Sequence, residues 1–315
     1  MRAIPAYPSE NTPVRTTGGA AGSWQRRLEN PLRRYYREPV ARWIARGLAQ
    51  TRLGADLLTG AGLSFAAAAA VLLTYSEPTY IVGAALAFEL RSLLGCAGAA
   101  LARERGLDPA GPSVRAAAWL GAAMLYAGIV CHLHLYPPPA GPWSEYLSTN
   151  SVLALAAAQA VVRALAAGHY RLKYRSIFEE GRDAPVESLR AKAQALGPSS
   201  TLADHLEVLV GRAEHLAFEH ERFDADRGAS SVDADRVKQL QREETSWLTR
   251  LITGLWAISD GEVFLSLVVL TLLLDKLWLG QVFFATVGVV WIVAVVCLNG
   301  WFLRGATRRA KPAVA

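Results

Sequence analysis

The chain has 315 residues, of which 52% are hydrophobic, with a mean hydropathy of +0.20 and a formal net charge of +6 at pH 7. The apolar residues are grouped in blocks of about 20, the length at which a helix crosses roughly 30 Å of hydrocarbon. This grouping excludes a soluble protein of one or two domains and predicts an all-α polytopic integral membrane protein. The sequence contains no P-loop, no G-x-S-x-G elbow and no nucleic-acid-binding module, so we expect no nucleic acid partner despite a pI near 9.4.

The first 27 residues lack a continuous apolar core and are predicted to be a disordered tail. A helix is predicted to begin at Asn30-Pro31 and to run to Gln50, with a break at Pro39. After the break, Arg42 and Arg46 lie on one helical face, and a second face is apolar. The apolar face comprises Val40, Trp43, Ile44 and Leu48. This pattern predicts an interfacial helix whose arginines contact lipid phosphates or, alternatively, an amphipathic helix packed on the protein itself.

Six apolar blocks are predicted to cross the membrane. They comprise residues 55–75, 79–101, 114–135, 147–168, 247–274 and 281–303. The second, fourth and fifth blocks contain ionisable residues, namely Glu89, Arg91, Arg163, Asp260 and Glu262. An ionisable side chain at the bilayer centre costs on the order of 3 kcal/mol, so each of these residues is a candidate functional residue.

Basic residues are distributed unevenly between the predicted loops. Segments 76–78, 136–146 and 275–280 contain only one basic residue, Lys276, whereas the arginine-rich runs precede the first block, follow the second and fourth, and end the chain. Because Lys and Arg resist translocation, both termini are predicted to be cytoplasmic. We expect a bacterial inner-membrane protein with membrane lipids as partners.

A long polar insert separates the fourth and fifth blocks. Within residues 170–246, the run VESLRAKAQAL is predicted to form one helix, and apolar residues spaced by three, four and seven predict a second, amphipathic helix. These apolar residues are Leu202, Leu206, Leu209, Ala213, Leu216 and Phe223. We expect a cytoplasmic helical hairpin that packs against the membrane domain or between protomers. The predicted division is therefore 1–27, 28–169, 170–246, 247–305 and a basic tail, 306–315.

The stretch SLLGCAGAALARERGLDPAGPSVRAAAW, residues 92–119, has the framework of a known motif without its acids. Its first half supplies Gly95, Gly98, Ala99, Ala102 and Arg103, and its second half supplies Gly111, Arg115 and Trp119. This framework resembles the signature of the CDP-alcohol phosphatidyltransferase superfamily, Asp-x2-Asp-Gly-x2-Ala-Arg followed by Gly-x3-Asp-x3-Asp. The resemblance extends weakly over most of residues 28–305, including the opening NPLRRYYREPVARWIARGLAQ.

The resemblance implies a six-span fold, a commonly homodimeric assembly, and transfer of a phosphoalcohol group from a CDP-linked donor. In the family, four aspartates bind two divalent cations, Mg²⁺ or Mn²⁺, that hold the donor diphosphate. Here the four positions hold Gly95, Gly98, Arg115 and Trp119, none of which ligates a hard cation through its side chain. A shift of one residue places Ala116 and Leu120 at the last two positions instead. We therefore expect no metal cofactor and assign no catalytic residue with certainty.

Substrate contacts are expected at the surviving motif residues and at the acids of the fifth block. They comprise Ala102, Arg103, Gly111, Asp260 and Glu262. A simpler interpretation of Arg103 and Arg115 is ordinary positive charge flanking a span. We also hypothesise that Arg115 pairs with Glu89, Asp260 or Glu262, so that an internal ion pair replaces the metal.

Two functions follow from these expectations. The first is a catalytically inactive member of the family that acts as a lipid-binding or regulatory protein in phospholipid metabolism, as a homodimer or with an intact family member. The alternative is an active CDP-alcohol phosphotransferase of phospholipid biosynthesis, with a rearranged site around Asp260, Glu262 and Arg103.

Overall fold

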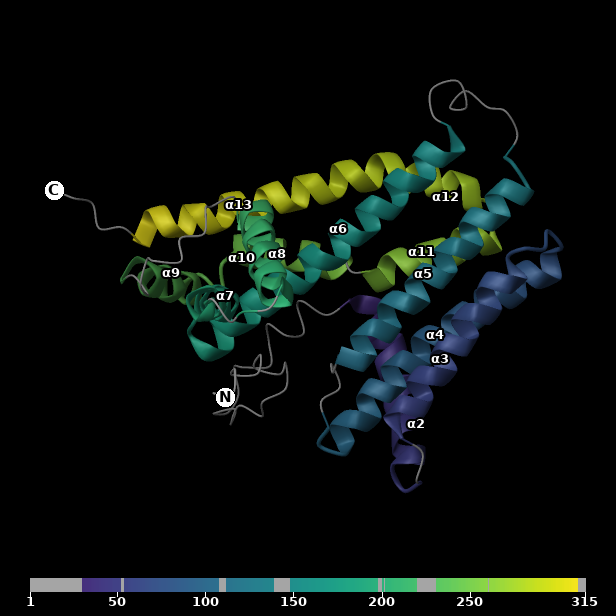
Figure 1. The fold of residues 1–315 in the computed structure, drawn as a ribbon, viewed down its shortest axis with the longest axis horizontal. Coiled ribbons are helices and arrows are strands. Elements are labelled where there is room, and N and C mark those ends of the chain that lie inside the picture. Colours follow the sequence, from purple (N-terminus) through teal and green to yellow (C-terminus); the bar gives the residue numbers. More distant parts are fainter. Residues whose placement is uncertain are drawn as a thin grey trace. The chain divides into compact units, whose positions relative to one another are not determined.

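The computed structural model describes residues 30–51, 54–107, 112–138, 148–197, 200, 202–219, 231–259 and 261–310, and all regular elements in these ranges are helices (Figure 1). The elements are η1 (Arg33–Arg37), α2 (Glu38–Ala49), α3 (Ala55–Leu72), α4 (Pro78–Glu104), α5 (Pro112–Leu135), α6 (Thr149–Arg175), η2 (Ser176–Glu180), α7 (Ala184–Ala195), α8 (Leu202–Glu219), α9 (Ser231–Arg242), α10 (Trp247–Ile258), α11 (Gly261–Leu273), α12 (Leu277–Phe283), η3 (Phe284–Gly288) and α13 (Val289–Ala310). The expected all-α class is confirmed for this part of the chain.

Among the described residues, five helices are long and apolar enough to cross a membrane, which supports an integral membrane protein. They are Ala55–Leu72, Pro78–Glu104, Ala116–Leu135, Thr149–Phe178 and Leu277–Gly305. The predicted span 247–274 is instead two helices, α10 and α11, and it makes a sixth span only if this pair is counted as one. The interruption falls at a Ser-Asp-Gly sequence. Ser and Asp side chains compete for backbone hydrogen bonds, and Gly leaves the backbone less constrained.

The chain forms two compact units. One contains residues 29–161 and 260–289, and the other contains residues 162–259 and 290–315, apart from short N-terminal pieces. The chain passes from the first unit to the second near the middle of α6, returns between α10 and α11, and passes to the second unit again at the start of α13. Each unit has its own hydrophobic core.

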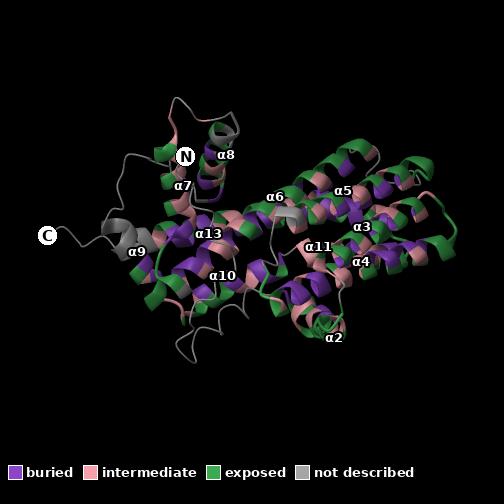
Figure 2. Cartoon of the chain, turned by 60° about the horizontal axis from the view of Figure 1, so that its bottom comes forward, coloured by how far each residue is buried: buried purple, intermediate pink, exposed green. Residues whose placement is uncertain are grey.

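Small residues bring the first three spans of unit 1 close together. α3, α4 and α5 lie side by side, with their exposed residues on the outer faces (Figures 1 and 2). A Cβ built on Gly128 of α5 would lie 2.7 Å from the Cα of Ala70 in α3. Where lipid is as apolar as the side chains, such close packing of small residues is a main source of helix association.

The N-terminal helix starts where the sequence predicts but does not break at Pro39. The Asn30 Oδ1 atom accepts a hydrogen bond from the Leu32 N–H at 2.9 Å, as in a helix cap. A π-helical turn, η1, then precedes Pro39, which sits in the first turn of α2. Because the wider turn and this early position accommodate a residue that has no N–H, the helix continues past the proline.

α2 packs on α4 and also exposes aromatic surface. Ala41 and Ala45 are buried, and Ile44 and Leu48 are partly buried beside Ala97 and Leu101 of α4. The Trp43 side chain, which the sequence places on the same apolar face, is 76% exposed. α2 thus packs on the protein through its alanines together with Ile44 and Leu48 of the predicted face, and the interfacial interpretation stays a prediction.

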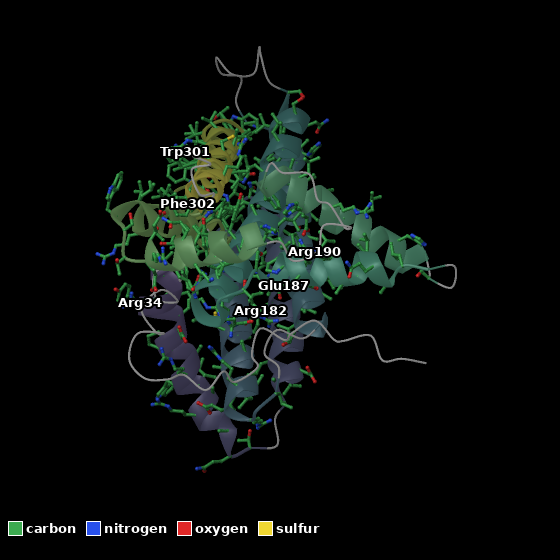
Figure 3. The ribbon with its side chains drawn as sticks, turned by 90° about the vertical axis from the view of Figure 1, so that its left-hand side faces the viewer. Arg34, Arg182, Glu187, Arg190, Trp301 and Phe302 are labelled. Carbon is green, nitrogen blue, oxygen red and sulfur yellow. The ribbon has the colours of Figure 1, made fainter. Side chains whose placement is uncertain are left out.

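The second unit is built around buried aromatic residues. Tyr170 stacks near Trp256 with 4.6 Å between ring centroids, and the Tyr174 hydroxyl donates to Asn299 Oδ1 at 2.5 Å. The turn that leaves α6 is closed by Lys173, whose Nζ lies 2.7 Å from Asp183 Oδ2. Just beyond it, Arg182 and Glu187 lie 3.7 Å apart at the start of α7 (Figure 3).

The packing face of α8 differs from its apolar stripe in the sequence. Val208 and Phe218 are buried, whereas Leu209 and Leu216 of the stripe are 62% and 53% exposed. Phe218 is held because its carbonyl accepts a hydrogen bond from the buried Tyr170 hydroxyl at 2.5 Å. Leu202, Leu206 and Phe223 of the stripe lie outside the described side chains.

We predict that Gly128→Ala destabilises the protein by about 1–3 kcal/mol, because the added methyl group meets the backbone of α3. The matched control is Gly168→Ala in the α6 span, where a Cβ meets no atom within 4 Å. Both changes add the same methyl group to a helix. Thermal unfolding of the purified protein in detergent measures the difference, and equal melting temperatures would contradict the close α3–α5 contact.

Candidate functional site: a buried arginine between two carboxylates

A buried guanidinium joins the N-terminal helix to two other helices of unit 1. The Arg37 Nε and Nη2 atoms donate to the two carboxylate oxygens of Glu89 at 2.9 and 2.8 Å. Nη2 also donates to the Ser266 hydroxyl of α11 at 2.9 Å. The Arg37 side chain is only 2% exposed, and that of Glu89 is 23% exposed. This two-pronged pairing is the strongest geometry available to an arginine and a carboxylate.

A second carboxylate lies beside the same guanidinium. Glu262 Oε2 is 3.7 Å from Arg37 Nη1, and Glu262 Oε1 is 3.8 Å from Arg33 Nη1. The thiol of Cys96 reaches Glu262 Oε1 at 4.0 Å. The two acids come from α4 and α11, so Arg37 neutralises charge on both helices at once.

The surroundings of Arg37 keep it charged. Burial lowers the pKa of the guanidinium, but the hydrogen bond to Glu89 and the negative charges of Glu89 and Glu262 outweigh that effect. The net pKa is therefore above its ordinary value. Arg37 is therefore a fixed cation at neutral pH.

The structure gives the two acids a partner that the sequence analysis did not name. Arg115 was hypothesised to pair with Glu89, Asp260 or Glu262, and Glu89 and Glu262 both contact Arg37. The side chain of Arg115 and the whole of Asp260 lie outside the described residues, as does Gly111. Sequence reasoning missed Arg37 and Ser266, although two acids inside spans already signalled that a buried cation must exist.

The degenerate motif positions of α4 have two different surroundings. Gly95 is exposed, and a Cβ built there meets no atom within 4 Å. A Cβ on Gly98 would lie 3.3 Å from the Ala55 carbonyl oxygen and 3.6 Å from Leu58 Cβ, both in α3. Helix α3 thus occupies the space that a longer side chain at position 98 needs.

The other described motif residues make contacts of their own. Ala102 is buried, and Arg103 donates from Nε to the Ala99 carbonyl of its own helix at 3.3 Å. The Arg103 Nη2 atom lies 3.8 Å from Glu38 of α2. Trp119 of α5 is 47% exposed. The structure therefore places Arg103 beside Glu38 and Glu262 beside Arg33 and Arg37.

These residues do not fit the divalent metals of the resembling family. Position 98 is filled by α3, position 119 carries an exposed indole, and the described acids of α4 and α11 that lie nearby are engaged by arginine. Among the residues that the structure describes, no group of three or more His, Cys, Asp or Glu side chains is arranged to hold a metal ion. Comparison with protein-family models, curated proteins and solved structures gave no match to this chain.

We predict that Arg37→Met destabilises the protein by about 3 kcal/mol, because Glu89 is left as an unpaired, largely buried charge. In the double variant with Glu89→Gln much of this loss is recovered, and a double-mutant cycle in detergent measures the coupling. The control pair is Glu38 and Arg42, four residues apart on α2 with Arg42 54% exposed. Its coupling is expected to be about 0.5 kcal/mol or less, and equal coupling in the two cycles would disprove the special role of Arg37.

We predict that aspartate is tolerated at position 95 but not at position 98. Gly95→Asp adds a carboxylate in open space, whereas Gly98→Asp brings one against the Ala55 carbonyl oxygen and Leu58. Folded yield and thermal unfolding in detergent compare the two variants, which carry the same added charge on the same helix. If both melt at the wild-type temperature, α3 does not restrict the side chain at position 98.

Proposed function

We propose that this chain is a non-catalytic relative of the CDP-alcohol phosphatidyltransferases that binds phospholipid within the bilayer. The observation that carries the proposal is the Arg37 guanidinium, which engages Glu89 and Glu262. Phosphoalcohol transfer from a CDP-linked donor relies on cations that are held by free carboxylates and that neutralise the diphosphate. Here the two carboxylates hold a side chain of the same protein, and an added dication would be repelled by that fixed charge.

The spans and the N-terminal helix support a lipid ligand. α2 combines the exposed Trp43 with the exposed Arg42 and Arg46, a composition typical of helices at the headgroup layer. We propose that this end of the molecule faces the cytoplasm, with the protein in a bacterial inner membrane, since the basic loops are at that end. In this setting the protein acts as a regulatory or assembly partner, with a second copy or with an intact, aspartate-bearing relative.

The alternative, an active transferase with a rearranged site, requires Glu262 and Arg103 to act on one substrate. The contacts favour the non-catalytic function, because Glu262 is paired with Arg33 and Arg37 while Arg103 lies beside Glu38. Freeing Glu262 for catalysis would leave Arg37 with fewer partners in a buried position. We therefore rank transferase activity second.

We predict that the purified full chain binds an anionic phospholipid saturably and releases no CMP from CDP-diacylglycerol with Mg²⁺ or Mn²⁺. Native mass spectrometry of the protein in detergent counts bound phosphatidylglycerol, and chromatography of the reaction mixture measures CMP. An aspartate-bearing family member assayed in the same mixture is the positive control. Metal-dependent CMP release would support the active transferase, and the absence of saturable lipid binding would refute the proposal itself.

A further inference from the structure

Arg91, halfway along α4, reaches across to α5 and rests on its backbone. The Arg91 Nη2 atom donates to the Ala118 carbonyl of α5 at 2.8 Å. A Cβ built on Gly121 would lie 2.7 Å from Arg91 Nε and 2.9 Å from Nη2. The guanidinium thus lies against the Gly121 backbone and the Ala118 carbonyl, in a space that a Cβ at position 121 would take. We name these two backbone groups the Arg91 seat.

The Arg91 seat lies close to one end of the apolar part of α5. That apolar part begins at Ala116, so Ala118 is only two residues inside it. Long basic side chains that start within a span place their charge near the headgroup layer in this way. On α5 the guanidinium therefore lies near the end of the span that follows Arg115, although Arg91 itself is halfway along α4.

Among the described residues, Arg91 forms no ion pair with a carboxylate. Its contacts there are the Ala118 carbonyl and the ring of Phe88, whose centroid is 5.9 Å from the guanidinium carbon. Glu262, the acid whose charge acts on Arg91, is paired with Arg33 and Arg37. A guanidinium has more N–H donors than one carbonyl can use, and phosphate oxygens match their geometry.

Open space lies one helical turn away from Arg91 on the same face of α4. Gly95 is exposed and meets no atom within 4 Å of a built Cβ. Residues four apart on a helix are neighbours, so Gly95 is next to Arg91 on this face of α4, on the side opposite to Phe88. On α5, Trp119 follows Ala118 directly and is 47% exposed, which offers an aromatic surface beside the same region.

We propose that Arg91, held in the Arg91 seat, binds the phosphodiester of a membrane phospholipid beside Gly95. The seat fixes one N–H on protein and leaves the others to the phosphate, while the acyl chains lie along the apolar outer surfaces of α4 and α5. This inference rests on the proposed lipid-binding function and adds its residue and its chemistry. The depth of the seat favours a lipid headgroup over free phosphate.

Binding of dioctanoyl phosphatidylglycerol to the full chain in detergent tests this proposal by native mass spectrometry. Arg91→Gln is expected to weaken binding about tenfold, as for loss of a charge-assisted hydrogen bond. Gly121→Ala is expected to weaken it as well, because the new methyl group displaces the guanidinium at little cost to folding. Arg91→Lys retains the charge without the planar donors, so intermediate affinity is expected.

The matched control is Arg304→Gln, because the exposed Arg304 also donates to a backbone carbonyl, that of Gly300 at 3.2 Å in its own helix. This variant is expected to bind like the wild type. Dioctanoylglycerol, which has no phosphate, and inorganic phosphate are the comparison ligands, and both are expected to bind more weakly than the phospholipid. Wild-type affinity in both Arg91→Gln and Gly121→Ala overturns the Arg91 site but leaves the proposed function intact. Equal binding of dioctanoylglycerol or of inorganic phosphate also overturns it, and no saturable binding by the wild type overturns both proposals.

Discussion

The ion pair between Arg37 and Glu89 is the contact on which the rest of unit 1 depends. A guanidinium that is 2% exposed and a carboxylate that is 23% exposed would each be costly to bury alone. Together with the Ser266 hydroxyl they make three hydrogen bonds, which bind a helix outside the spans to α4 and α11. Ala41 and Ala45 of α2 can then pack closely on α4, because the charged contact already fixes the position of the helix.

In this arrangement Glu89 and Glu262 stabilise the fold by pairing with Arg37. A metal ion that bridges carboxylates can exchange and can bring its charge to a bound diphosphate, whereas a guanidinium fixed to a helix does neither. Further along α4, a Cβ at position 98 would lie against the Ala55 carbonyl and Leu58 of α3. The charge pairing and the close packing are independent observations, and both support the proposed binding function without phosphoalcohol transfer.

Local patterns in the sequence predicted the helices well. They could not predict contacts between residues that are distant in the sequence. The spans follow from the lengths of the apolar blocks, and the helix start at Asn30 follows from its capping side chain. Arg37 and Glu89 are 52 residues apart, and Arg37 and Ser266 are 229 apart, so no periodicity could assign these partners. The face of α8 was equally hidden, because the buried Tyr170 hydroxyl holds the backbone at Phe218 while Leu209 stays exposed. The interruption between α10 and α11 falls at Ser-Asp-Gly, but the length of the apolar block around it led to the prediction of a single span.

The contrast between Arg37 and Arg91 separates the two uses of arginine in this unit. Both guanidinium groups come from or reach α4, yet one has carboxylates on two sides and the other has a carbonyl, an aromatic ring and open space. A cation whose charge is paired with two carboxylates stabilises the fold and has little affinity left for an anionic ligand. A cation that rests on a backbone carbonyl without a carboxylate partner retains that affinity, because its remaining donors need further acceptors. Phospholipid headgroups supply such acceptors, so we expect lipid recognition at Arg91 rather than at Arg37.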